Sequence, residues 1–301
     1  MKKLLLILLT SCPLLSFGQA SDTTYWKIGG VSSLSFSQVS LTNWAAGGNN
    51  SVAFNSYFNT FANYTRDRVI WENSLELGYG LIKQADADFE KSDDKINLST
   101  KYGRTLSESN DDWFWTVSLN FRTQFADGFE VGDNTTPISR FLAPGYLVVA
   151  AGLDYKPNEY FSLAYAPVTG KITIVNDDLL AAQGAFGVDP GSKSRTELGS
   201  FLSLHFKKDI MENVNLESRL QLFSNYSENP ENIDVNWDNA IIMKINRFLS
   251  ASLINQLIFD EDIRFPITNS QGDVIGDESN IQFKSIFGIG LTYKFGAGKD
   301  E

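Results

Sequence analysis

Apolar and polar residues alternate along most of this chain, and this period of two limits what the chain can fold into. Between Trp113 and Phe125 the odd positions are mainly aromatic or aliphatic, whereas the even positions after Phe114 are Thr, Ser, Asn, Arg and Gln. Successive side chains of a β-strand point to opposite faces. The pattern therefore predicts a strand with one apolar and one polar face.

The alternation recurs in about twelve segments, most of them longer than the ~5–6 residues of an ordinary strand. A tilted strand that crosses a membrane needs ~9–11 residues. Short turns alternate with longer connections such as Lys83–Asp94 and Val168–Ser194, as in outer-membrane barrels. The sequence predicts an all-β fold, a single transmembrane antiparallel up-and-down β-barrel of about 12 strands. The predicted strands are Trp26–Ser37, Ser51–Tyr64, Val69–Ile82, Lys95–Arg104, Trp113–Phe125, Leu147–Tyr155, Phe161–Pro167, Arg195–Phe206, Val214–Tyr226, Ile233–Asn246, Leu249–Phe259 and Asn280–Phe295.

A soluble β-sandwich is the alternative, because it shows the same alternation with its apolar faces buried between two sheets. Three features favour the barrel. The polar faces of the strands beginning at Val214 and Ile233 carry many charges and amides, and aromatic residues gather near the strand ends, as in interfacial girdles. The last strand ends in Tyr293-x-Phe295, which looks like the C-terminal signal read by the barrel-assembly machinery, although the tail Gly296–Glu301 departs from that signal.

The first residues predict export. Lys2 and Lys3 precede an apolar run that ends in small residues near Gly18 and Gln19, so residues 1–19 are predicted to be a signal peptide and residues 20–301 the barrel domain. The run Leu9-Thr10-Ser11-Cys12 leaves lipidation of Cys12 as an alternative, against which Pro13-Leu14-Leu15 is more apolar than a lipoprotein tether.

Composition excludes several function classes. The chain has 301 residues, with 25 Lys and Arg against 36 Asp and Glu, so its net charge of −11 disfavours nucleic acid as a partner. Its single cysteine excludes a disulfide or zinc scaffold. The acidic stretch Asp86–Glu90 fails as a calcium loop, because Lys91 and Asn97 occupy positions that require Gly and a carboxylate. No cofactor or metal is therefore expected.

The segment that follows the leader resembles a known family. It reads Trp26-Lys27-Ile28-Gly29-Gly30 and then Leu34-Ser35-Phe36-Ser37-Gln38-Val39-Ser40-Leu41-Thr42-Asn43-Trp44-Ala45-Ala46-Gly47-Gly48. It is similar to the start of an uncharacterised family of secreted β proteins of Bacteroidota, domain of unknown function 3078, and the similarity extends to Ala166–Lys171 and Phe287–Leu291. The resemblance implies an outer-membrane location in a diderm bacterium and no assigned activity.

Two groups of residues are candidates for function. Asn43, Trp44, Gly47 and Gly48 lie in a predicted loop that could contact a partner or fold into the lumen. His205, the only histidine, alternates with Leu202, Leu204 and Phe206, so it is predicted to face the lumen, away from lipid substrates. The candidate lumen-lining residues are Arg122, His205, Glu217, Arg219, Asp234, Asp238 and Lys244.

Three functions follow from this fold. A barrel of about 12 strands lies between eight-stranded barrels, which are filled by side chains, and those of ~16, which hold a channel. A passive channel for small solutes is the first hypothesis, a structural or adhesive envelope protein with a plugged lumen is the second, and a lipid hydrolase, which the orientation of His205 disfavours, is the third. The expected partners are outer-membrane lipid, lipopolysaccharide and, during insertion, the barrel-assembly machinery.

Overall fold

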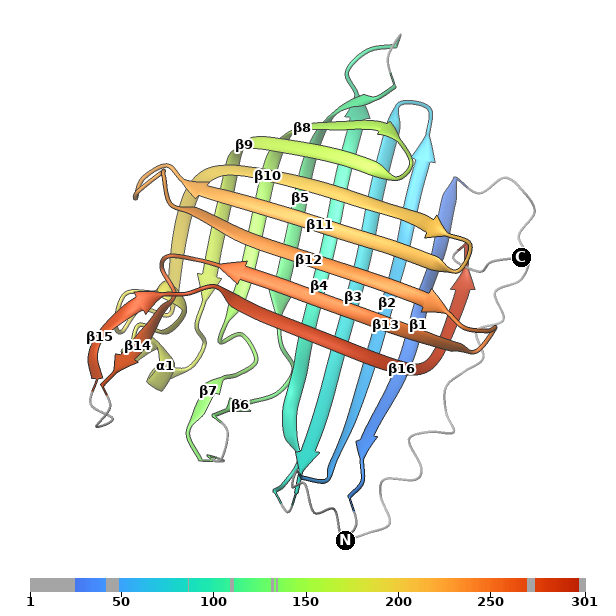
Figure 1. Cartoon of the computed structure of the whole chain (residues 1–301). Coiled ribbons are helices and arrows are strands. Elements are labelled where there is room, and N and C mark those ends of the chain that lie inside the picture. The colour runs from blue at the N-terminus through green and yellow to red at the C-terminus, as the bar shows by residue number, and fades with distance from the viewer. Residues whose placement is uncertain are drawn as a thin grey trace, which may run out of the picture.

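The computed structural model describes residues 25–41, 49–85, 87–108, 111–130, 133, 135–269 and 274–297. Twelve antiparallel strands form a closed barrel in the order β1-β16-β13-β12-β11-β10-β9-β8-β5-β4-β3-β2 (Figure 1). Barrel strands that follow one another along the chain lie next to each other in the wall, as the up-and-down prediction requires. The barrel strands are β1 (Trp26–Val39), β2 (Ser51–Arg66), β3 (Val69–Gln84), β4 (Glu90–Thr105), β5 (Trp113–Thr123), β8 (Gly145–Asn158), β9 (Phe161–Ile174), β10 (Ser194–Met211), β11 (Val214–Asn225), β12 (Ile233–Lys244), β13 (Leu249–Phe259) and β16 (Gln282–Gly296).

The twelve predicted strands are confirmed, and several are longer than predicted. Two of the long connections are much shorter than predicted. The segment Val168–Ser194 was expected to be a loop, but β9 runs to Ile174. The segment Lys83–Asp94 was expected to be a long loop, but β3 runs to Gln84 and β4 starts at Glu90, so the hairpin extends beyond the alternating residues. The register of the two strands shifts where Gly80 and Leu81 face Asp93 and Lys91, and this bulge on β4 breaks the alternation by which a strand is recognised.

The two ends of the barrel are unlike. At the turn end, short turns join successive strands, and the wall begins and ends there, at Trp26 and Gly296. At the loop end, three connections carry secondary structure of their own, which Figure 1 shows gathered at one end of the barrel. These additions, which the sequence did not predict, are the hairpin β6 (Gly128–Phe129) with β7 (Pro137–Ser139), helix α1 (Asp178–Ala182) with the 3-10 turn η1 (Ala185–Gly187), and the hairpin β14 (Arg264–Thr268) with β15 (Val274–Ser279).

The apolar face of each strand points out of the barrel. On β13, Leu253 and Leu257 pair with Phe287 and Phe283 of β16, whose exposed fractions are 62% and 66%. The alternate residue Ser250 is buried and hydrogen-bonded to Thr292 inside the barrel. This is the reverse of a soluble sandwich, in which such phenylalanines are buried.

Several predictions fall outside the described residues. These are the signal peptide at residues 1–19, the lipidation of Cys12 and the loop residues Asn43, Trp44, Gly47 and Gly48. In the described part of the chain, no helix is both long enough and apolar enough to span a membrane.

The barrel closes where the first and last strands meet. Gly30 on β1 is the register partner of Phe295 on β16, and the Phe295 ring stacks on Phe58 of β2 at a centroid distance of 6.1 Å. A side chain at Gly30 would meet the Asn59 carbonyl oxygen and lie 2.5 Å from Phe295 Cζ. The absence of a side chain at Gly30 therefore lets one aromatic ring bridge the closing seam.

Replacing Gly30 with valine should open this seam. We expect Gly30→Val to destabilise the folded barrel by about 1–3 kcal/mol, because the added carbons clash with backbone and ring. Urea unfolding in detergent micelles measures the change. Gly170→Val on β9 is the matched control, since nothing lies within 4 Å of a Cβ at that position. Equal stability losses for the two variants would contradict the seam.

Candidate functional site

The lumen of the barrel is the candidate site, and a cluster of charges stands at its loop end. Lys171 on β9 is buried, and its Nζ lies 2.6 Å from Asp234 on β12, 3.2 Å from Asp260 after β13 and 3.5 Å from Glu197 on β10. We call these four residues the mouth cluster. One lysine thus faces three carboxylates that come from three different parts of the wall.

Arg195 connects the mouth cluster to the loops. Its guanidinium lies 2.9 Å from Glu228 in the β11–β12 connection, 2.9 Å from Asp262 after β13 and 3.5 Å from Glu197, and it donates a hydrogen bond to the Gly187 carbonyl of η1. Loop segments that are far apart in the sequence are therefore held over the barrel by one cation.

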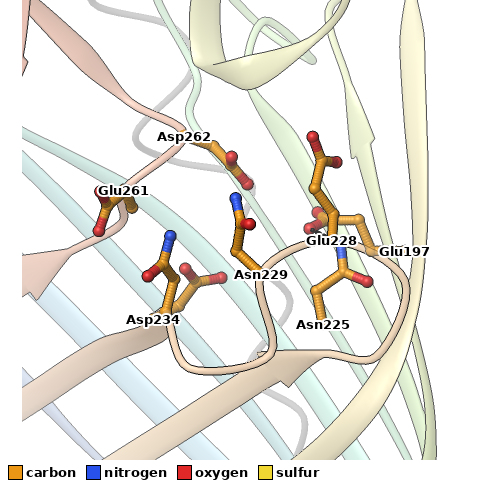
Figure 2. Close-up of a pocket in the computed structure, with 8 residues that line it drawn as sticks. Glu197, Asn225, Glu228, Asn229, Asp234, Glu261 and Asp262 are labelled. Atoms are coloured by element: carbon orange, nitrogen blue, oxygen red, sulfur yellow. Dashed lines mark hydrogen bonds between the residues drawn. The ribbon is translucent and has the colours of Figure 1, made fainter.

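A small pocket lies between these loops and the wall. Figure 2 shows Asn229 and Asp262 converging on it from opposite sides. Its volume of about 20 Å³ has room for a water-sized ligand and no more. The pocket is lined by Glu197, Asn225, Glu228, Asn229, Asn232, Asp234, Glu261 and Asp262.

Further inside, an ion pair joins opposite walls of the lumen. Lys95 on β4 lies 2.9 Å from Glu76 on the neighbouring β3 and 3.8 Å from Asp238 on β12. Strands β4 and β12 are six places apart in the wall in either direction, so they face each other. We call Lys95, Glu76 and Asp238 the lumen bridge. Their side chains keep 16%, 18% and 30% of their surface exposed, so water reaches all three.

A third cluster lies towards the turn end. Lys101 on β4 lies 2.6 Å from Asp154 on β8 and 3.0 Å from Glu72 on β3, and Lys156 forms a second ion pair with Glu72. Asp154 is completely inaccessible to water, and its Oδ1 has no hydrogen-bond partner. Equal numbers of positive and negative side chains offset the cost of removing these charges from water.

The predicted lumen residues fall into distinct places. His205 Nε2 lies 3.2 Å from the Glu217 carboxylate, which also forms ion pairs with Lys207 at 2.8 Å and Arg219 at 3.5 Å. Three of the predicted residues, His205, Glu217 and Arg219, therefore form one group near the turn end. Arg122 stands apart with its guanidinium 5.5 Å from the centre of the Tyr146 ring.

The other three predicted residues also point into the lumen, at different heights along β12. Asp234 belongs to the mouth cluster, Asp238 belongs to the lumen bridge, and Lys244 ends the inward face of β12 at the turn end. The sequence interpretation missed their cationic partners, Lys171 and Lys95. Lys95 could have been found, because it lies in a predicted strand and alternates with outward apolar residues. Lys171 could not, because it lies in the segment Val168–Ser194, which was predicted to be a loop.

No metal centre is found in the described ranges. Among these residues, no group of three or more His, Cys, Asp or Glu side chains is arranged to hold a metal ion. The three carboxylates of the mouth cluster are instead directed at a lysine.

Comparison with known proteins adds a family match and weak structural likenesses. The profile of a family described as "Protein of unknown function (DUF3078)" matches residues 36–129. This agrees with the resemblance noted from the sequence over about a third of the chain, from within β1 to β6. No curated protein matches the sequence.

Three solved structures illustrate the structural likeness. The COG4313 outer membrane channel from Pseudomonas putida F1 is 12% identical with a TM-score of 0.40, and the match covers 91% of this chain and 96% of that one. The translocator domain of autotransporter NalP from Neisseria meningitidis is 9% identical with a TM-score of 0.34, covering 92% and 91%. The P. putida toluene transporter TodX is 8% identical with a TM-score of 0.25, covering 92% and 89%. Likenesses this low say nothing about what this chain does.

Removing the lysine of the mouth cluster should destabilise the barrel. We expect Lys171→Met to cost about 3–5 kcal/mol of unfolding free energy, because it leaves buried carboxylates without their cation. Urea unfolding followed by tryptophan fluorescence measures this. The matched control is Lys193→Met, whose pair with Asp178 is exposed, and we expect no measurable change from it. A Lys171 variant as stable as the unmutated chain would show that the cluster does not hold the mouth together.

Proposed function

We propose that this chain is an outer-membrane β-barrel whose narrow, charge-lined lumen passes small ions and small hydrophilic solutes. The observation that carries the proposal is the exposure of the lumen bridge to water between two charged clusters, inside a wall with an apolar outer face. Charged side chains of both signs in a hydrated passage suit small ions and disfavour apolar solutes.

The outer face supports the membrane location. Aromatic side chains near the turn end point outward and contact one another, as in Trp26 with Trp71 at 5.6 Å and Trp113 with Tyr155 at 4.7 Å. Amphipathic rings of this kind favour the boundary between hydrocarbon and water. Because the sheet is closed, its strands leave no unpaired edge to the hydrocarbon. Export through a signal peptide would place the turn end in the periplasm and the loop end outside the cell.

Partners follow from this placement. We propose that lipid tails cover the outward apolar side chains, and that lipopolysaccharide surrounds the loop end. The barrel-assembly machinery would read the final strand, on which Tyr293 and Phe295 point outward and stack at 6.4 Å. Bacteroidota as the source stays an expectation from the sequence resemblance.

A structural barrel with a closed lumen is the second candidate. It is favoured by the contact of Lys95 with Asp238, because side chains from opposite walls meet and narrow the passage. The two candidates differ in whether the gaps around the lumen bridge conduct ions.

We propose further that the barrel is not an enzyme. His205, the sole histidine, points into the lumen and pairs with Glu217 and not with a nucleophile on the lipid-facing wall. Lipid hydrolysis by the purified protein that is abolished by His205→Ala would contradict this.

Conductance in planar bilayers tests the channel. We expect the unmutated protein to give small, steady unit steps, and Lys95→Ala to raise the unit conductance at least about twofold, because it removes the longest side chain of the lumen bridge. The same variant should increase cation selectivity, since Glu76 and Asp238 remain without their cation.

Lys208→Ala is the matched control for Lys95→Ala. Lys208 lies over the Tyr160 ring at 4.4 Å, outside the lumen, so its removal should leave the conductance unchanged. Absence of unit steps in the unmutated protein and in Lys95→Ala, after verified insertion, would exclude the channel and favour the closed structural barrel.

A further inference from the structure

A row of polar side chains crosses the outer face of the barrel. It consists of Ser218 on β11, Asn239 on β12, Asn255 on β13 and Ser285 on β16, and we call it the polar row. Each residue is the register partner of the next one, so four adjacent strands carry the row side by side.

The polar row faces outward amid apolar residues. Residues two places away along a strand share its face, and among them Trp237 and Phe287 have exposed fractions of 43% and 62%. Two apolar rows flank it on each side, so it lies within the apolar band and not at its edge. Towards the loop end these rows are Leu220, Trp237, Leu257 and Phe283, then Leu222, Val235 and Phe259; towards the turn end they are Leu216, Ile241, Leu253 and Phe287, then Val214, Met243, Ala251 and Ile289.

The two amides in the centre of the row lack hydrogen-bond partners. Within the described ranges, neither the Asn239 nor the Asn255 side chain makes a hydrogen bond, and Asn255 Oδ1 is also shielded from water. Among the described residues, Ser218 is the one member of the row with a hydrogen bond, which its hydroxyl accepts from the Trp237 indole nitrogen at 3.0 Å. Hydrocarbon offers neither donors nor acceptors, so lipid tails over these amides would leave them unsatisfied.

Another outward asparagine of the barrel shows the contrast. Asn73 on β3 donates to the Ala62 carbonyl at 3.0 Å and accepts from the Thr100 hydroxyl at 2.8 Å. Its amide is satisfied within the wall, and it needs nothing from outside. The amides of the polar row are in the opposite situation.

We propose that the polar row is the contact surface for a second copy of this chain in the membrane. An asparagine amide carries donors and an acceptor, so two polar rows that face each other across a two-fold axis can satisfy one another. The flanking apolar rows would pack around this contact, as side chains do around polar groups between membrane helices. The inference rests on the proposed membrane location, because in water the amides would be hydrated without a partner.

Cysteine cross-linking in native membranes tests the contact. In a Cys12→Ser background, we expect Asn239→Cys, Asn255→Cys or Ser285→Cys to give a disulfide-linked dimer on mild oxidation, because a two-fold axis brings equivalent residues together. Leu98→Cys is the matched control. It points outward on β4, the strand opposite β12, and should give no dimer.

A second measurement uses the chain without new cysteines. Sedimentation in detergent micelles should show a dimer, and Asn239→Leu with Asn255→Leu should raise its dissociation constant at least about tenfold. Val149→Leu, an outward position on β8, should leave the dissociation constant unchanged. Heat-modifiable mobility in electrophoresis checks that each variant is folded.

The outcomes separate this inference from the proposed function. A chain that fractionates with the outer membrane but stays monomeric, or cross-links only to a different protein, would overturn the second copy as partner and leave the membrane location standing. A chain recovered in the soluble fraction would overturn the membrane location itself.

Discussion

Closure of the hydrogen-bonded wall is the constraint on which the structure depends. Every barrel strand pairs with a neighbour on both sides, and the last strand, β16, returns to the first, β1. Because the strands then have no edge, the backbone can pass through hydrocarbon without unpaired polar groups. The alternation of side chains sends apolar residues to the outside and charged residues to the inside, so the polarity of a soluble protein is inverted.

The inside of the barrel must then accommodate many charges in a confined space. Lys171, Lys95 and Lys101 each face at least two carboxylates, and in each case the carboxylates come from different strands or connections. These pairs do two things at once. They offset the cost of partial dehydration, and they tie distant parts of the wall together, which narrows the lumen. The width available to a solute is therefore set by side chains and not by the strand number alone.

The strands could be predicted because alternation is a local property. The segment Leu249–Phe259 was placed residue for residue, and its inward and outward faces follow from it. The full length of β9 could not be predicted, since a register shift between Ala151 and Leu153 of its partner β8 changes which positions of β9 point inward. Beyond this bulge Thr169 and Lys171 face the lumen, although the alternation had ended at Pro167.

Contacts across the lumen could not be predicted from the sequence for a different reason. Asp238 was placed on an inward face, but its partner Lys95 stands on the opposite wall, and the pairing depends on how closure and strand stagger bring β4 and β12 to the same depth. The additions at the loop end were also not predicted, because short hairpins and a five-residue helix leave little periodic signal.

Spin-label accessibility on neighbouring residues of β13 tests the inverted polarity most directly. Labels at Leu253 and Ile254, in a Cys12→Ser background reconstituted into lipid vesicles, sit on opposite faces of one strand. The label at Leu253 should collide with dissolved oxygen and be shielded from a water-soluble nickel chelate, whereas the label at Ile254 should be less accessible to oxygen. Free access of the nickel chelate to Leu253, or the reverse order of oxygen accessibility, would contradict a wall whose apolar face meets lipid.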